Sequence, residues 1–199
     1  LVSSASQSDI YGAETEELWA LLYEESGDRG QAIESYRQAL VLDPSRVDYL
    51  LELAELYALS RQWDEAALWM ERYIQTRPFA LASYWELLGE YLVAGGRVGE
   101  SAAAFERALD LEPYSYLARL RLAEILEGRG EFEAAIGLLE FLSIYALDRN
   151  PEIYTRLAYL YNQTGQIAQM QRILDKGARI FPTDTTIYRQ RRTLETSSN

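Results

Sequence analysis

Apolar residues recur along the chain at helical spacing, and the pattern returns about every 34 to 35 residues. Within residues 45–78, Leu50, Leu53, Ala54 and Tyr57 fall three or four residues apart, and a second such run follows. Spacings of three and four place side chains on one face of an α-helix. Each block therefore predicts two amphipathic helices, and we expect no strand.

Five such blocks align when the prolines serve as anchors. Pro44 and Pro78 lie 34 residues apart, Pro78 and Pro113 lie 35 apart, and Pro182 follows two periods later, with Leu147 in the place of the intervening proline. Two further positions recur in every block. Twenty-five residues before the anchors lie Trp19, Leu53, Leu88, Leu122 and Leu157, and seventeen before them lie Gly27, Arg61, Gly96, Gly130 and Gly165.

These positions also predict where the helices begin and end. Glycine adopts positive φ at little cost, so the recurrent glycines predict a tight turn between the two helices of a block. Proline lacks an N–H and clashes with the preceding helical turn, so each proline is expected to end a second helix. The pair Ser45 and Asp48 resembles a capping box at the start of a first helix. Thr183 or Asp184 is expected to cap one additional helix that reaches about Leu194.

The expected domain organisation follows from this periodicity. Residues 1–12 are expected to form a linker or disordered N-terminus, and residues 185–199 a capping helix with a frayed tail. Between them we expect five repeats, at residues 13–46, 47–81, 82–115, 116–150 and 151–184.

The pattern resembles the tetratricopeptide repeat (TPR) family over residues 13–184. The family signature has, at fixed spacing, a large residue, Leu, Gly or Ala, and Tyr, followed by Ala, Phe, Ala and Pro. It appears most fully as Trp85, Leu88, Gly89, Phe105, Ala108 and Pro113. In that repeat Leu92 replaces the tyrosine and Ser101 the first alanine, and the fifth repeat has Met170 and Gly177 where alanine is usual. The resemblance implies an all-α, right-handed helical solenoid of five helix-turn-helix repeats plus a C-terminal capping helix, arranged as an open arc. It also implies a non-catalytic scaffold or adaptor that binds a protein or peptide.

The amino-acid composition excludes several classes of catalytic and metal-binding site. The chain has 31 acidic and 19 basic residues, no Cys and no His, and a net charge of -12. This composition excludes a Ser-His-Asp triad, a cysteine nucleophile and a Cys/His zinc site. The glycine-rich stretch 95–101 lacks the lysine of a phosphate-binding loop. We therefore expect no enzyme, no cofactor and no metal, and a helical enzyme acting through paired carboxylates remains only as the last alternative.

The charge also bears on partners and compartment. An acidic chain lacks the basic footprint that nucleic-acid binding requires, so we expect no nucleic acid. No run of 18 apolar residues occurs, so we expect no transmembrane segment but a soluble protein, cytoplasmic or periplasmic, whose compartment the sequence does not give. Because Leu1 rather than Met begins the sequence, we expect a processed or excised piece.

Charge is distributed unevenly along the chain. Residues 151–199 hold seven basic and four acidic residues, whereas residues 1–150 hold 12 basic and 27 acidic ones. Two interpretations remain open. The acidic part is a solvated surface, or the basic end contacts the acidic body of a second copy, which makes the chain a homo-oligomeric self-assembly module.

The family resemblance implies that the first helix of each repeat lines a concave groove through four outward positions. Ten of these twenty positions are acidic and none is basic. Glu55, Glu90 and Glu124 recur at one of them, so we expect a ladder of carboxylates along the groove. The expected partner-binding residues are Glu14, Glu17, Leu21, Glu24, Asp48, Leu51, Glu55, Glu86, Glu90, Leu117, Leu120, Glu124, Glu127 and Tyr159.

These residues favour a groove for a basic, partly apolar peptide or helix, and a merely solvated face is the alternative. Some TPR adaptors bind the acidic C-termini of chaperones through basic and amide side chains on the first helices. The positions implied by that resemblance hold no basic residue here. An asparagine ladder known in other TPR proteins is also missing, since its positions hold Leu18, Glu52, Leu87, Arg121 and Arg156.

Overall fold

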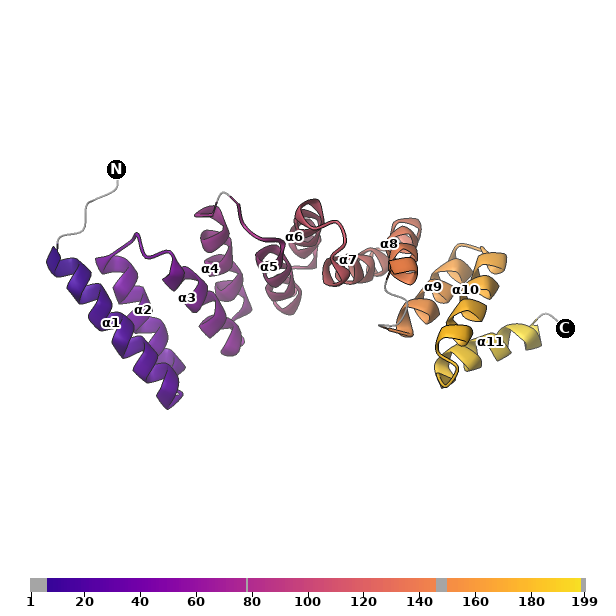
Figure 1. Cartoon of the computed structure of the whole chain (residues 1–199), viewed down its shortest axis with the longest axis horizontal. Helices are drawn as coiled ribbons and strands as arrows, with labels where there is room; N and C mark the ends of the chain where they lie inside the picture. Colours follow the sequence, from indigo (N-terminus) through magenta and orange to yellow (C-terminus); the bar gives the residue numbers. More distant parts are fainter. Residues whose placement is uncertain (1–6, 78, 146–149, 198–199) are drawn as a thin grey trace. The chain divides into compact units, whose positions relative to one another are not determined.

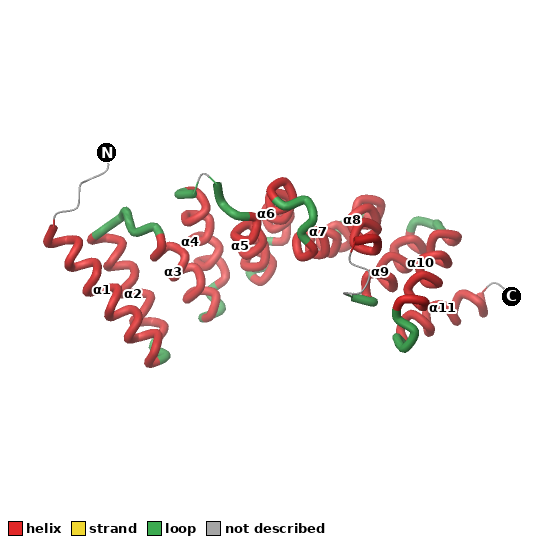
Figure 2. The backbone as a smooth tube through the Cα atoms, in the orientation of Figure 1, coloured by secondary structure: helices red, strands yellow, loops and turns green. Residues whose placement is uncertain are grey.

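The structure is a computed structural model, and it describes residues 7–77, 79–145 and 150–197. These residues form eleven helices and no strand (Figures 1 and 2). The chain divides into two compact units, Leu1–Ala108 and Leu109–Asn199. The helices are α1 Gln7–Ser26, α2 Arg29–Leu42, α3 Asp48–Leu59, α4 Trp63–Gln75, α5 Ala82–Ala94, α6 Val98–Leu111, α7 Tyr116–Gly128, α8 Phe132–Tyr145, α9 Glu152–Gln163, α10 Ile167–Ile180 and α11 Thr185–Ser197.

Consecutive helices pair into hairpins. Helix α1 packs on α2, α3 on α4, α7 on α8 and α9 on α10. Helices α5 and α6 meet where Gly89 lies against the ring of Phe105. Helix α11 packs on both α10 and α9. The all-α fold of five helix-turn-helix units followed by a C-terminal helix is thus confirmed.

The inter-helix turns depend on positive φ, as the recurrent glycines predict. Gly27, Gly96, Gly130 and Gly165 have φ between 72° and 81°. Arg61 takes the same conformation in the second hairpin, with φ of 58°. Glycine reaches this region without a steric penalty, whereas an arginine does not.

Two other glycines are required because helices approach closely. A Cβ on Gly89 would lie 2.6 Å from Cζ of Phe105. A Cβ on Gly177 would lie 2.9 Å from Cβ of Tyr154. Phe105 and Tyr154 are fully buried, so neither ring has room to withdraw.

The N-terminal boundary differs from the expectation. Helix α1 already begins at Gln7, so the linker expected over residues 1–12 is wrong for residues 7–12, and residues 1–6 lie outside the described part. Helices α3 and α7 follow Pro44 and Pro113, which lie just after the helix before them, but no proline occurs among residues 7–12. Nothing therefore interrupts α1 there.

The capping predictions had mixed outcomes. The capping box is wrong, because Asp48 begins α3 and the Ser45 hydroxyl donates instead to Asp43 at 2.6 Å. The cap of α11 is confirmed, since Asp184 accepts hydrogen bonds from the N–H groups of Thr186 and Ile187. That helix continues to Ser197, past Leu194, where its end was expected. The predicted helix end at Pro78 and the anchor Leu147 lie outside the described residues.

Candidate partner-binding site

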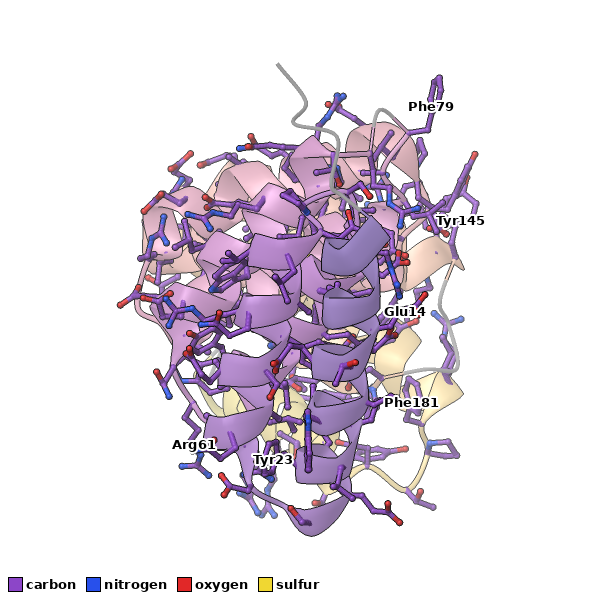
Figure 3. All side chains as sticks on the ribbon, turned by 90° about the vertical axis from the view of Figure 1, so that its left-hand side faces the viewer. Glu14, Tyr23, Arg61, Phe79, Tyr145 and Phe181 are labelled. Carbon is purple, nitrogen blue, oxygen red and sulfur yellow. The ribbon has the colours of Figure 1, made fainter. Side chains whose placement is uncertain are left out.

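All fourteen predicted partner-binding residues lie on the first helices α1, α3, α5, α7 and α9, and none of them is buried. The half-buried ones are Glu17, Glu24, Leu51, Glu86, Glu90, Leu117, Leu120, Glu124 and Glu127. The exposed ones are Glu14, Leu21, Asp48, Glu55 and Tyr159, and Figure 3 labels Glu14 on α1.

In the first unit, α1 meets the loop before α3 through a carboxylate. Glu17 accepts two hydrogen bonds from Nη2 of Arg46, at 3.0 and 3.2 Å, and a third from the Tyr49 hydroxyl at 2.7 Å. The Arg46 guanidinium also lies 4.6 Å from the centroid of the Tyr49 ring. Glu17 therefore joins consecutive repeats, a structural role that its predicted position in a groove did not suggest.

Two more of the predicted carboxylates have partners within the chain. Glu24 accepts a hydrogen bond from the Tyr36 hydroxyl at 2.8 Å, and Asp48 accepts one from Arg77 at 3.0 Å. Burial, and then the bond to Glu24, raise the pKa of the Tyr36 phenol. The donors come from second helices and inter-repeat loops, which the pattern of the first helices does not contain.

The sequence analysis did not include Glu52 among the partner-binding residues, although this residue lies among the acidic side chains of α1 and α3. Glu52 on α3 is half-buried, and burial raises the pKa of its carboxyl. The charges of Glu55 and Glu24, and then of Asp48 and Glu17, raise it further. Glu52 therefore lies among like charges, where its ionised form is disfavoured.

In the second unit the acidic residues are bridged by arginine. Nη1 of Arg156 on α9 donates to Glu124 at 2.6 Å, and its Nη2 donates to Glu127 at 2.7 Å. Arg121 adds a bond to Glu124 at 3.0 Å. Burial lowers the pKa of Arg156, but the bonds to Glu127 and Glu124 outweigh it and raise the pKa overall. The Arg156 side chain is only 16% exposed, so these two carboxylates are already occupied.

A signal for this pairing was present in the sequence. Arg121 and Arg156 occupy positions of the missing asparagine ladder, and Arg121 lies one turn before Glu124 on the same helix face. A pair at i, i+3 meets on a helix surface, as Arg121 and Glu124 do. The contact from Arg156 back to the previous repeat depends on how two hairpins stack, which spacing alone does not give.

A separate cavity of about 590 Å³ lies between α2, α3 and α4. None of the fourteen predicted residues lines it. Its walls include Leu40, Leu50 and Trp69, with Arg37 and Arg72 among the charged residues. The Trp69 indole N–H is buried and has no acceptor among the described residues.

Other chemistry receives no support from the part of the chain that the structure covers. Among the described residues, no three acidic side chains are placed to hold a metal ion. Within the same ranges, no helix is both long and apolar enough to cross a membrane. What the arrangement offers is acidic and apolar surface on the first helices, together with carboxylates that accept hydrogen bonds from cationic side chains.

The hairpins, positive-φ turns and small residues at helix crossings agree with a comparison against known families. A tetratricopeptide repeat family profile matches residues 18–80 and 86–140, and a second one matches residues 151–184. The chain belongs to the tetratricopeptide repeat family. The sequence-based assignment to TPR proteins is thereby confirmed.

Similar proteins extend the comparison. Superkiller protein 3 of Schizosaccharomyces pombe is 23% identical over 206 residues, which cover 80% of this chain but only 15% of that protein. The solved structure of YrrB, described as a TPR protein with an unusual peptide-binding site, has a TM-score of 0.70 at 18% identity, covering 89% of this chain and 90% of its own. A MamA structure has a TM-score of 0.70 at 20% identity, covering 85% and 92%. These likenesses concern the fold.

Proposed function

We propose that this TPR chain is a non-catalytic scaffold that binds a basic, partly apolar peptide or helix on its first helices. The observation that carries the proposal is the contrast between α9 and α3. The position that Arg156 occupies in α9 is occupied by Glu52 in α3. A partner's arginine or lysine would supply at Glu52 the positive charge that Arg156 supplies within the chain.

The surroundings of the two positions correspond. Arg156 meets Glu127 of the preceding repeat, and the residue equivalent to Glu127 in the first repeat is Glu24. Arg121 pairs with Glu124 three residues later, and Glu52 has Glu55 at that spacing. Of the two carboxylates that Arg156 bridges, that of Glu127 is retained as Glu24, whereas Leu21 occupies the position of Glu124. The guanidinium is replaced by a further carboxylate. A bound cation would relieve the repulsion that raises the pKa of Glu52.

Apolar side chains beside these acids supply the other half of the proposed recognition. Leu21 on α1 is 49% exposed, and Leu51 on α3 is half-buried next to Glu52. Apolar contacts add affinity, while the carboxylates steer a cationic partner and set its register. In the second unit Leu117, Leu120 and Tyr159 would serve the same purpose.

The test introduces at position 52 the arginine that the chain has at the equivalent position 156. Glu52→Arg should pair with Glu24 and Glu55, retain the fold, and remove binding of the native partner. Glu106→Arg on the exposed face of α6 makes the same change of charge away from the proposed site and should leave binding unchanged. The partner is first captured with the wild-type chain from the source organism, and its affinity for each variant is then measured by calorimetry. Unchanged affinity for Glu52→Arg contradicts the proposal.

Glu124→Lys is a poor test of the same idea. Glu124 is bridged by Arg156 and Arg121, so a lysine there would leave two guanidinium groups next to a new positive charge. Loss of binding in that variant would reflect disruption of the hairpin contact. Substitutions at Glu52 and Glu55 avoid this difficulty, because no arginine bridges either of them among the described residues.

A further inference from the structure

The cavity of about 590 Å³ between α2, α3 and α4 is separate from the proposed partner-binding surface. Leu50 and Tyr57 line it from α3. At about 100° per residue, these two positions lie on one face of α3, whereas Glu52 and Glu55 lie on the opposite face. Sites for small ligands have volumes of about 300–1,000 Å³, so this cavity is large enough to hold one.

The second unit has a hydrogen bond at the equivalent place. There the Tyr161 hydroxyl on α9 donates to the Glu140 carboxylate on α8. Counted from the repeat anchors, the equivalent residues of the first unit are Tyr57 on α3 and Arg37 on α2. Arg37 has no acceptor on its side chain, and the Tyr57 hydroxyl makes no hydrogen bond with the described residues. The first unit therefore retains the donor but lacks the carboxylate.

Arg37 is also the exception among the five repeats. The other four have an acidic residue at this position: Glu71, Glu106, Glu140 and Asp175. One of these carboxylates, that of Glu71, lies 3.7 Å from Nη2 of Arg97. Nη1 of Arg37 lies 3.7 Å from the carboxylate of Glu34 on its own helix, and both side chains are more than half exposed. The charge at this position is thus reversed in the repeat that lines the cavity.

A second departure from the repeat lies on α4. Trp69 occupies a position that holds a smaller residue in the other four repeats: Ser35, Ala104, Leu138 and Ile173. The Trp69 ring stacks on the Tyr57 ring, with centroids 6.5 Å apart, and the Arg72 guanidinium lies 4.6 Å from the centroid of the Trp69 ring. The Trp69 indole N–H is buried without an acceptor among the described residues, which is unfavourable for a donor. Hydroxyl, indole and guanidinium donors therefore line one cavity, a set that favours an anionic ligand.

The remaining lining residues limit the kind of anion. Glu34 and Glu65 also line the cavity, and they would repel a ligand with several negative charges. Glu34 already accepts a hydrogen bond from Nε2 of Gln38 at 2.8 Å. Aliphatic side chains form another part of the wall: Leu40, Val41, Leu50 and Leu68. These walls fit a ligand with a single negative charge and an aliphatic body.

From these observations we propose that the cavity binds a small aliphatic monocarboxylate. Its carboxylate takes the place in the first unit that the Glu140 side chain has in the second. Tyr57, Arg37 and Arg72 supply donors for it, and hydrogen bonds of this kind are strengthened by the charge of the acceptor. The proposal does not depend on the proposed function, because none of the fourteen predicted partner-binding residues lines the cavity.

Three probes with one aliphatic chain test the class of ligand: octanoate, octanamide and octylammonium. Calorimetry measures their binding to the full chain, below the concentrations at which the probes aggregate. Octanoate should bind about tenfold more tightly than octanamide, since only octanoate accepts charge-assisted hydrogen bonds. Octylammonium brings a positive charge towards Arg37 and Arg72 and should not saturate the cavity. The blocked tripeptide acetyl-Leu-Glu-Leu-amide offers the same carboxylate from a protein side chain and should bind more weakly than octanoate.

A substitution that restores the acidic residue of the other repeats tests the position. Arg37→Glu should weaken octanoate binding about tenfold with unchanged circular dichroism, because its carboxylate can accept from Tyr57 as Glu140 accepts from Tyr161. Arg29→Glu makes the same change of charge at the exposed start of α2, outside the cavity. It should leave the affinity within about twofold, since salt screens charges at this separation.

The hydroxyl group is tested by a smaller change. Tyr57→Phe removes a hydroxyl that has no partner among the described residues, so it should weaken octanoate binding about threefold without lowering stability. Tyr161→Phe is the matched control, because it removes the equivalent hydroxyl from the second unit. It should leave octanoate binding unchanged.

Three results would overturn the proposal. One is octanoate that fails to saturate the wild-type chain or binds no more tightly than octanamide. Another is an unchanged affinity for octanoate in either Arg37→Glu or Tyr57→Phe. The third is tighter binding of the tripeptide than of octanoate, because this result would assign the cavity to an acidic side chain of a protein.

Discussion

At the residue scale, two close helix contacts in this chain place a large aromatic side chain opposite a glycine. Gly89 opposite Phe105 follows the family signature and was expected. Gly177 departs from that signature, and its reason is the fully buried Tyr154 ring beside it. The sequence shows both residues, 23 positions apart, but only the packing of α9 on α10 shows that they share one volume. The spacing of residues along the sequence does not reveal which glycine faces which large side chain.

The Gly89 contact gives a direct prediction. Gly89→Leu should lower the free energy of unfolding by about 1–3 kcal/mol, because its first added carbon already overlaps the Phe105 ring. Gly137→Ala on α8, where a new Cβ meets nothing within 4 Å, should instead stabilise the chain by about 0.5–1 kcal/mol. Urea unfolding of both variants checks this. Equal stability of Gly89→Leu and wild type would contradict the helix register.

Arg61 gives the opposite prediction. An L-residue in the left-handed region costs about 1–2 kcal/mol, part of which glycine offsets by its greater freedom in the unfolded chain. Arg61→Gly should therefore raise the free energy of unfolding by about 0.5–1 kcal/mol. Gly130→Ala places a side chain at φ of 76° and should lower it. A shift of the same sign in both variants would show that φ does not control these turns.

At the element scale, the number and pairing of helices and the cap of α11 followed from the sequence, but the starts of α1 and α3 did not. Two of the errors have one origin. Capping and helix termination depend on which side-chain oxygen reaches a free N–H, and Ser45 was in reach of Asp43 rather than of the first turn of α3. Likewise, the polar residues before Ala13 suggested a linker, although no proline occurs among residues 7–12, which are helical. The polar composition suggested a helix boundary near residue 13, but α1 is continuous through that position.

The raised pKa of Glu52 predicts that the stability of the chain depends on pH. Since the folded-state pKa of Glu52 is raised, its contribution to stability is fully present below the unfolded-state pKa and is lost as pH rises through the folded-state pKa. Glu52→Gln should therefore be more stable than wild type at pH 7, by about 0.2–0.5 kcal/mol for each like-charge pair removed. This advantage should disappear below about pH 4.

Thermal unfolding of both chains at pH 3.5 and pH 7 measures this difference. Glu106→Gln, on the exposed face of α6, serves as the control and should change stability little at either pH. A Glu52→Gln chain that is less stable than wild type at neutral pH would mean that Glu52 makes a favourable contact in the folded state.

At the scale of the whole molecule, counting acidic residues on the first helices overestimated how many of their carboxylates lack a partner within the chain. Counting charges at outward positions treats every carboxylate as open. In the structure Glu17, Glu24 and Asp48 accept hydrogen bonds within the first unit, and Glu124 and Glu127 do so within the second. Several donors lie 29 to 32 residues away, close to one repeat length. Periodicity thus places donor and acceptor correctly but does not reveal that they bond.

The net charge of -12 and this pairing lead to a prediction for partner class. A peptide that ends in acidic residues and a free carboxylate needs cationic donors on the first helices. Arg156 and Arg121 are there, but their guanidinium groups are hydrogen-bonded to Glu124 and Glu127. An acidic peptide would have to displace these carboxylates while it met repulsion from the rest of the chain. We therefore expect no measurable affinity in calorimetry at 0.15 M salt or at 0.02 M salt, where screening is weakest. Micromolar binding of such a peptide would show that Arg156 exchanges its partners, and it would argue against the proposed preference for basic ligands.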